Sequence, residues 1–258
     1  MKKLIAANWK MNKTAKEAAK FLDELLKLAR IDDKVEILIC PPFTCLHALT
    51  KDLRGKIKLG AQNMNMHNSG AYTGEISPLM LKEHGCEYII LGHSERREFF
   101  FEDDAMINQK VISALKHGLI PILCVGEQLK ERESGKAHEI VKSQLKNCLE
   151  NIPGSEASKI VVAYEPVWAI SRGNSKVKPA TSDDAQEMHK LIRETLDTIY
   201  DKNFGRRIRI IYGGSMKPEN SIELLGMPDI DGGLVGNASL DAKSFSEIIK
   251  PATTNKIQ

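Results

Sequence analysis

Side chains able to do chemistry come directly after short aliphatic runs in this sequence. They include a carboxylate that can serve as a base, Glu165, an imidazole, His93, and a fixed cation, Lys10. Two later runs are followed by small residues with accessible backbone amides, at positions 213–215 and 236–237. A base, an electrophile, a cation and amides suited to phosphate together predict proton abstraction beside a carbonyl group in a small phosphorylated substrate.

The elements that must position these side chains alternate along the chain. The aliphatic runs are expected to be parallel strands buried on both faces, and the segments between them carry apolar residues at helical spacing, clearest at 15–29, 104–116 and 181–199. The strands are expected at residues 4–7, 35–40, 57–61, 88–91, 119–125, 160–163, 208–212 and 233–235. This pattern predicts an α/β fold, a single (β/α)8 barrel over residues 1–258, with a polar C-terminal tail at 251–258. Because barrel enzymes carry their reactive groups at the carboxyl ends of the strands, the chemistry is expected on one rim.

Composition disfavours several classes of protein. The chain has 37 Lys+Arg against 34 Asp+Glu and 42% hydrophobic residues, which argues against a nucleic-acid partner and against a disordered chain. The five cysteines contain no CxxC pair, so we expect free thiols in a reducing cytoplasm and no metal site. The N-terminus contains no signal-peptide core and no membrane span is expected. A basic cluster at Arg206, Arg207 and Arg209 is expected to be a solvated face.

Five motifs occur in one order between residues 4 and 249. They are Asn8-Trp9-Lys10, Gly92-His93-Ser94-Glu95-Arg96-Arg97, Cys124-Val125-Gly126-Glu127, Tyr164-Glu165-Pro166-Val167-Trp168-Ala169-Ile170 and Tyr212-Gly213-Gly214-Ser215. Together they closely resemble the triosephosphate isomerase family, whose fold is the TIM barrel. The resemblance implies interconversion of dihydroxyacetone phosphate and D-glyceraldehyde 3-phosphate through an enediol, without a cofactor or a metal.

The resemblance also implies a role for each matched residue. Glu165 matches the general base, and His93 matches a neutral imidazole that donates to the developing oxyanion, for which this family is the standard example. Lys10 and Asn8 match groups that stabilise the negative charge of the transition state. Trp9 lies between them and is counted with the substrate-binding residues.

Three further matched residues are expected to support the site. Glu127 is expected to pair with Lys10, and Glu95 is expected to orient the same network. Cys124 either supports the site or simply fills the core, because its neighbours in the expected strand are apolar.

The resemblance places phosphate recognition on backbone N–H groups of Ser215, Gly236 and Asn237. Asn237 stands where the family usually has glycine, and asparagine tolerates a left-handed backbone better than most residues. The loop after the expected base matches a lid that closes over the substrate, but it is longer here, and Ser171 replaces a phosphate-binding glycine. Either Ser171 or Gly173 is therefore expected to contact the phosphate.

A second long loop resembles the segment by which family members pair. The stretch 60–75 matches a loop that docks into a second subunit beside its active site. A homodimer is implied, in which Thr73 reaches toward the partner's Asn8 and the partner's Lys10.

Two other functions remain open at this point. The long lid is compatible with a barrel that binds triose phosphate without converting it, or with an isomerase for a bulkier sugar phosphate. A dinucleotide-dependent dehydrogenase and a P-loop kinase are set aside, because no strand is followed by GxGxxG and the chain contains no GxxxxGK[ST].

Overall fold

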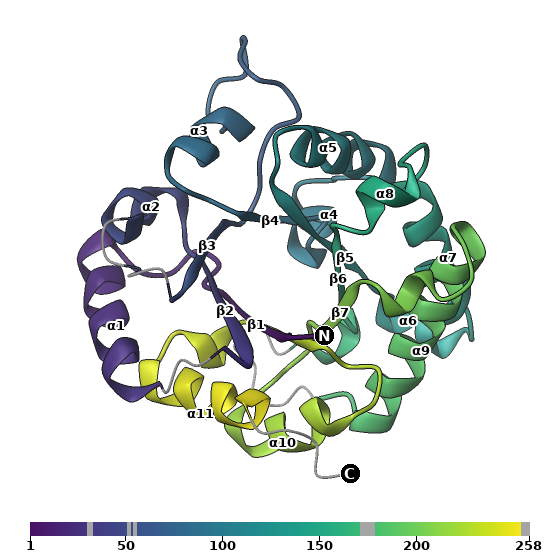
Figure 1. Cartoon of the computed structure of the whole chain (residues 1–258). Coiled ribbons are helices and arrows are strands. Elements are labelled where there is room, and N and C mark those ends of the chain that lie inside the picture. The colour runs from purple at the N-terminus through teal and green to yellow at the C-terminus, as the bar shows by residue number, and fades with distance from the viewer. Residues whose placement is uncertain (30–32, 51–52, 54–55, 171–178, 254–258) are drawn as a thin grey trace.

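The fold is a closed barrel of parallel strands, as the alternating pattern predicted. A computed structural model describes residues 1–29, 33–50, 53, 56–170 and 179–253. Within these residues the strands follow one another around the barrel in chain order, and β8 pairs with β1 (Figure 1). They are β1 (Lys3–Asn8), β2 (Val35–Cys40), β3 (Lys58–Ala61), β4 (Tyr88–Leu91), β5 (Ile120–Val125), β6 (Val161–Tyr164), β7 (Arg209–Tyr212) and β8 (Gly232–Val235).

Helices surround the barrel and connect its strands (Figure 1). The three helices expected from periodicity are confirmed, as α1 (Ala15–Leu28), α5 (Asp104–Lys116) and α9 (Ser182–Ile199). The others are α2 (Phe43–Thr50), α3 (Pro78–Glu83), α4 (Ser94–Phe99), α6 (Leu129–Glu133), α7 (Ala137–Cys148), α8 (Gly154–Ala157), α10 (Pro218–Gly226) and α11 (Ala242–Thr253). Short 3-10 turns are η1 (Val167–Ala169), η2 (Phe204–Arg206) and η3 (Asn237–Ser239).

Local sequence explains where the longest helices begin. Thr14 caps α1 by accepting a hydrogen bond from the N–H of Glu17, whose side chain accepts in return from the Thr14 N–H. Thr181 and Asp184 form the same reciprocal pair at the start of α9. Each pair satisfies backbone donors that the first helical turn leaves without partners.

The core has two layers because strand side chains alternate between the two faces of the sheet. Leu4 and Ala6 of β1 point into the barrel, whereas Ile5 and Ala7 pack against the surrounding helices. Both layers are mostly aliphatic, which explains why each strand reads as a continuous apolar run rather than an alternating one.

The amino end of the barrel carries an ion-pair network where the sequence predicted a solvated basic face. Arg209 is half-buried, lies 3.2 Å from the Glu36 carboxylate and donates to the Tyr88 hydroxyl at 2.7 Å, and Tyr88 also bonds to Glu36. The prediction was therefore wrong for Arg209, although Arg206 and Arg207 are exposed. These three partners come from β7, β2 and β4, so the network links strands across the barrel.

The first three residues of the predicted polar tail are helical. Helix α11 continues through residues 251–253, and Ala252 is buried against the core. Residues 254–258 lie outside the described part of the chain. No helix among the described residues is both long and apolar enough to span a bilayer.

The segment between β3 and α3 projects away from the barrel (Figure 1). Its base is closed by a hydrogen bond from the Asn65 N–H to the Ile76 carbonyl at 2.8 Å. Nearer the tip, His67 stacks on Tyr72 with ring centroids 4.7 Å apart. Thr73, the expected dimer contact, is exposed at this tip. Residues 67–75 of this segment are exposed in the single chain, whereas Asn63 and Met64 at its base are buried.

Candidate active site

The residues expected to do chemistry line one cleft at the carboxyl ends of the strands. The cleft has a volume of about 840 Å3. Its lining includes the expected catalytic and phosphate-binding residues Asn8, Lys10, His93, Glu95, Glu165, Ser215, Gly236 and Asn237. Segments that are far apart in the sequence therefore meet at one rim, because all the parallel strands end on the same side of the barrel.

Glu165 is a buried carboxylate at the end of β6. Its side chain is 2% exposed, its Oε2 accepts a hydrogen bond from the Ser94 N–H at 2.8 Å, and its Oε1 lies 3.0 Å from His93 Nε2. Burial alone would raise the pKa of Glu165, but the contacts with His93 and Ser94 and the field of Lys10 outweigh it and hold the pKa below its usual range. The carboxylate is therefore ionised at neutral pH, as a general base requires.

The backbone of Glu165 is set by a close approach at Gly126. The Glu165 N–H donates to the Val125 carbonyl at 2.8 Å, which extends the pairing of β5 with β6. A Cβ at position 126 would lie 1.7 Å from the Glu165 carbonyl oxygen, so only glycine fits. On the other side, a Cβ at Gly213 would meet the Glu165 Cγ at 2.8 Å.

The hydrogen bonding of His93 selects one protonation state. The Glu95 N–H donates to His93 Nδ1 at 3.2 Å, which requires a lone pair on that nitrogen. The ring is therefore neutral with its proton on Nε2, the nitrogen that faces Glu165. His93 also caps helix α4, which begins at the next residue, Ser94. His93 Nε2 is thus a neutral hydrogen-bond donor in the cleft.

Lys10 is held by contacts on both its backbone and its side chain. It has a positive φ of 50°, a conformation stabilised by its N–H bond to Asn8 Oδ1 at 3.1 Å. The Lys10 carbonyl accepts from Gln62 Nε2 at 2.9 Å, and Nζ pairs with Glu95 Oε1 at 2.7 Å. Gln62 was not among the expected site residues, although it directly follows β3, the same signal that marked the other residues of the rim.

The expected pair of Glu127 with Lys10 is wrong. Lys10 pairs with Glu95, whereas Glu127 is fully buried and accepts from Trp168 Nε1 at 2.7 Å and from the Tyr164 hydroxyl at 3.1 Å. Glu127 bonds to these two donors because it follows β5 on the side that packs against β6, where both donors lie. Burial raises the pKa of Glu127 even though both donors oppose that shift. Glu127 thus anchors the segment that follows Glu165.

The expected phosphate-binding residues follow β7 and β8, which are paired strands, and they line the cleft. Gly236 immediately precedes η3, and a Cβ there would meet the Lys10 Cε at 3.6 Å. Asn237 begins η3 and is not among the residues with a positive φ. The left-handed backbone considered for Asn237 is therefore not adopted, and the position does not require glycine.

Other expected site residues lie away from the cleft or outside the described residues. Trp9 is fully buried and packs edge-on against Phe21, with ring centroids 5.0 Å apart. Cys124 is fully buried and faces the barrel interior, the core alternative left open by the sequence. Ser171 and Gly173 fall in the segment 171–178, which the structure does not describe. No group of three or more metal-ligating side chains occurs in the described ranges.

The fold and the cleft define a (β/α)8-barrel isomerase, with a base and a neutral imidazole donor beside a lysine. The family model for triosephosphate isomerase matches residues 3–252. Curated relatives named triosephosphate isomerase include those of Dictyoglomus thermophilum, 50% identical over 96% of this chain and 99% of its own length, and Finegoldia magna, 52% identical over 96% and 98%. That of Fusobacterium nucleatum is 52% identical over 96% and 97%. The chain belongs to the triosephosphate isomerase family.

Proposed function

We propose that this chain interconverts dihydroxyacetone phosphate and D-glyceraldehyde 3-phosphate by moving one proton through an enediol. Family membership supports the reaction. The observation that carries the mechanism is the pair formed by an ionised, buried Glu165 and a neutral His93, 3.0 Å apart in one cleft. A protein that only bound the substrate would have no physical need for both groups.

Glu165 is the proposed base. It takes a proton from one of the two carbons that carry the carbonyl and hydroxyl groups, and it returns a proton to the other. General-base catalysis of this kind typically contributes ~10²- to 10⁴-fold in rate. Its pKa lies below the usual range, so the carboxylate is charged when the substrate arrives.

His93 and Lys10 are proposed to stabilise the oxygen that becomes negative. The Nε2–H of His93 donates a hydrogen bond to this oxygen. The ring is neutral, so it acts as a hydrogen-bond donor and carries no additional proton. Lys10 Nζ supplies a fixed positive charge, and Asn8 lies beside it as an amide donor. Removal of one donor of this kind typically costs ~10²- to 10³-fold in rate.

We propose that the phosphate group binds between Ser215, Gly236 and Asn237, with Ser171 or Gly173 of the long loop as a further contact. The first three residues follow the adjacent strands β7 and β8 and line the cleft that contains Glu165. Backbone N–H groups at such strand ends suit a phosphate because they offer several donors without a bulky side chain.

A homodimer and a cytoplasmic location are also proposed. The projecting segment around Thr73 supports the dimer, since it exposes an ordered tip that includes Tyr72, 45% exposed. The five cysteines support the location, because all are buried free thiols, which persist in a reducing compartment.

The test is to supply glyceraldehyde 3-phosphate and to quantify dihydroxyacetone phosphate against methylglyoxal, the product of phosphate elimination from the enediolate. Near-exclusive isomerisation supports the proposal and a long loop that protects the intermediate. Substantial methylglyoxal above the non-enzymatic background would leave the proposed roles of Glu165 and His93 unchanged. It would indicate that the loop 171–178 fails to protect the enediolate from phosphate elimination. No turnover would favour a binding protein, and faster turnover of a longer sugar phosphate would favour the bulkier substrate.

A further inference from the structure

Arg132, on helix α6, contacts residues on both sides of the segment 171–178. Its Cζ lies 4.3 Å from the centroid of the Trp168 ring, shortly before that segment. Its Nη2 donates to Asp184 Oδ1, shortly after that segment. Its Nη1 lies 3.5 Å from Oε1 of the buried Glu127. One guanidinium group thus joins the chain before the long loop to the chain after it.

The partners of Arg132 are themselves held by hydrogen bonds. Trp168 Nε1 donates to Glu127 Oε1 at 2.7 Å, so the indole is held at its edge by Glu127 and on its face by Arg132. Asp184 uses its other oxygen, Oδ2, to accept from the N–H and the hydroxyl of Thr181 at 3.1 and 2.7 Å. Arg132 therefore binds the cap of helix α9, where the chain returns from the loop.

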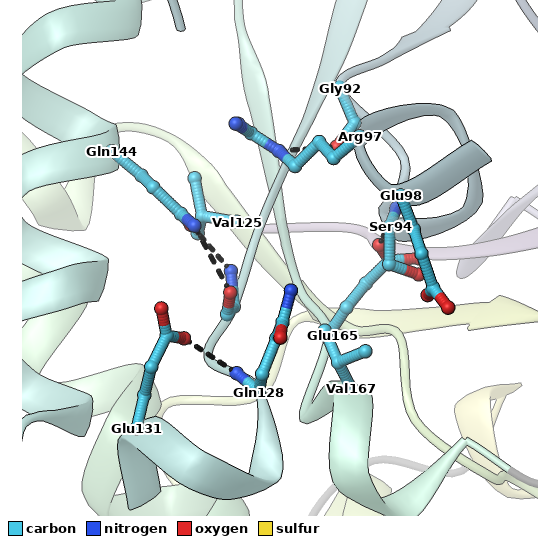
Figure 2. A pocket seen from close by; sticks show the side chains of 11 residues that line it. Gly92, Ser94, Arg97, Glu98, Val125, Gln128, Glu131, Gln144, Glu165 and Val167 are labelled. Carbon is cyan, nitrogen blue, oxygen red and sulfur yellow. Dashed lines mark hydrogen bonds between the residues drawn. The ribbon is translucent and has the colours of Figure 1, made fainter. Parts of the chain in front are cut away.

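The short helix that carries Arg132 is fixed to the rim of the barrel. Figure 2 shows the hydrogen bond from the Gln128 N–H to the Glu131 carboxylate, 2.7 Å long, at the start of α6. Just before this helix, the side chain of Gln144 on α7 exchanges hydrogen bonds with the backbone of Gly126 at 2.8 and 3.1 Å (Figure 2). Arg132 thus extends from a fixed support.

The contacts of Arg132 need the shape of a guanidinium group. Its plane can stack on an aromatic ring while its edge donates to carboxylates, whereas the ammonium group of lysine is a point charge without a flat face. The Arg132 side chain is 31% exposed, so water screens its ion pairs and their contribution to stability is small. The importance of Arg132 therefore lies in where it holds its partners.

We propose that Arg132 is a positioning residue, which holds the two described ends of the long loop in a fixed relation to the cleft. The inference rests on the proposed function, in which this loop protects the enediolate and contributes a contact to the phosphate. Ile170, the last described residue before the segment, lines the cleft, whereas Arg132 is absent from its described lining. A loop with fixed ends loses less conformational freedom when it contacts a substrate. Arg132 acts on the substrate through Trp168 and Asp184.

The experiment measures the fraction of the enediolate that loses its phosphate. Glyceraldehyde 3-phosphate is supplied, and methylglyoxal and dihydroxyacetone phosphate are quantified together after subtraction of the non-enzymatic background. In the side reaction an electron pair of the enediolate expels inorganic phosphate from the neighbouring carbon, and the remaining enol becomes methylglyoxal, so no oxidant is needed. The methylglyoxal fraction does not depend on how much of the protein is folded, so a loss of stability alone leaves it unchanged.

Arg132→Met is expected to raise the methylglyoxal fraction severalfold, because the two ends of the loop lose their shared contact. Arg132→Lys keeps the charge without the stacked plane and is expected to raise the fraction nearly as much. Asp184→Asn keeps an oxygen for Thr181 but weakens the ion pair, so a smaller rise is expected. The double variant of Arg132→Met and Asp184→Asn is expected to match Arg132→Met, because both changes act on one contact.

Arg207→Met is the matched control. Arg207 pairs with Asp201 at 2.5 Å and lies 4.8 Å from the centroid of the Phe204 ring, so it makes the same two kinds of contact as Arg132. It precedes β7 and therefore lies at the opposite end of the barrel from the cleft. The methylglyoxal fraction of Arg207→Met should equal the native value.

A native methylglyoxal fraction in Arg132→Met would overturn the positioning role. An equal rise in Arg207→Met would also overturn it, as would fold-increases of Arg132→Met and Asp184→Asn that multiply in full in the double variant. Failure of the proposed function looks different: the native protein then makes no dihydroxyacetone phosphate, or Glu165→Gln turns over at the native rate.

Discussion

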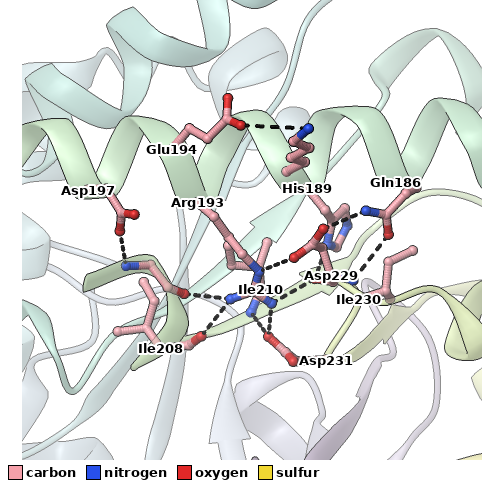
Figure 3. Close-up of polar contacts among 12 residues, drawn as sticks. Gln186, His189, Arg193, Glu194, Asp197, Ile208, Ile210, Asp229, Ile230 and Asp231 are labelled. Atoms are coloured by element: carbon pink, nitrogen blue, oxygen red, sulfur yellow. Dashed lines mark hydrogen bonds and ion pairs between the residues drawn. The ribbon is translucent and has the colours of Figure 1, made fainter. Parts of the chain in front are cut away.

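Acid is expected to destabilise this fold through His189, a fully buried histidine on α9 (Figure 3). Its Nδ1 lies 3.2 Å from the Asp229 carbonyl, so the neutral ring donates there, and its Nε2 has no hydrogen-bond partner among the described residues. Burial lowers the pKa of His189 to about 3, and the nearby charge of Arg193 adds to the effect while the Asp229 carbonyl opposes it.

The sign and size of the effect follow from proton binding. The pKa is depressed in the folded state, so below the unfolded value of 6.5 the unfolded chain binds a proton that the folded chain does not. The contribution of neutral His189 to the free energy of unfolding is therefore complete above pH 6.5. It decreases as the pH falls, down to a pH of about 3. At pH 5 the loss is ~2 kcal/mol, from 1.36 kcal/mol for each pH unit below the unfolded pKa.

Urea unfolding at pH 7 and pH 5, at one fixed protein concentration, measures this loss. His189→Asn keeps an amide donor for the Asp229 carbonyl and removes the titration. Between pH 7 and pH 5 the free energy of unfolding of this variant should therefore fall by ~2 kcal/mol less than that of the native protein. His138→Asn is the matched control, because His138 is exposed and pairs with Glu187 at 2.8 Å. Equal pH dependence in the native protein and in His189→Asn would refute the reasoning.

Three substitutions test the remaining assignments. Glu165→Gln should lower kcat by at least ~10²-fold with little change in inhibitor binding, because the base is lost; steady-state kinetics showing native turnover would remove Glu165 from its role. Lys10→Met should raise KM and lower kcat through loss of a fixed charge, and unchanged values for both would exclude it as the anchor. Gly126→Ala should reduce folded yield or activity sharply, since its Cβ would lie 1.7 Å from the Glu165 carbonyl oxygen; circular dichroism and activity at native levels would contradict that clash.

Local sequence determined the barrel and most of the rim. The strands are continuous apolar runs because both of their faces are buried, and that pattern is visible without any long-range information. Parallel strands all end on one side, so the residues that follow them, among them Lys10, His93 and Glu165, converge whatever their separation in the chain. The cleft was therefore predictable once the strands were.

Tertiary structure alone decided which of these side chains pair. Lys10 binds Glu95, 85 residues away, rather than Glu127, and Arg209 binds Glu36, 173 residues away, rather than solvent. Such choices depend on the direction of each side chain and on the donors packed beside it, which residue type and local spacing do not specify. The same holds for the neutral ring of His93, since its state follows from one N–H placed 3.2 Å from Nδ1. The sequence thus determined which groups share the rim, and packing decided their partners and charge states.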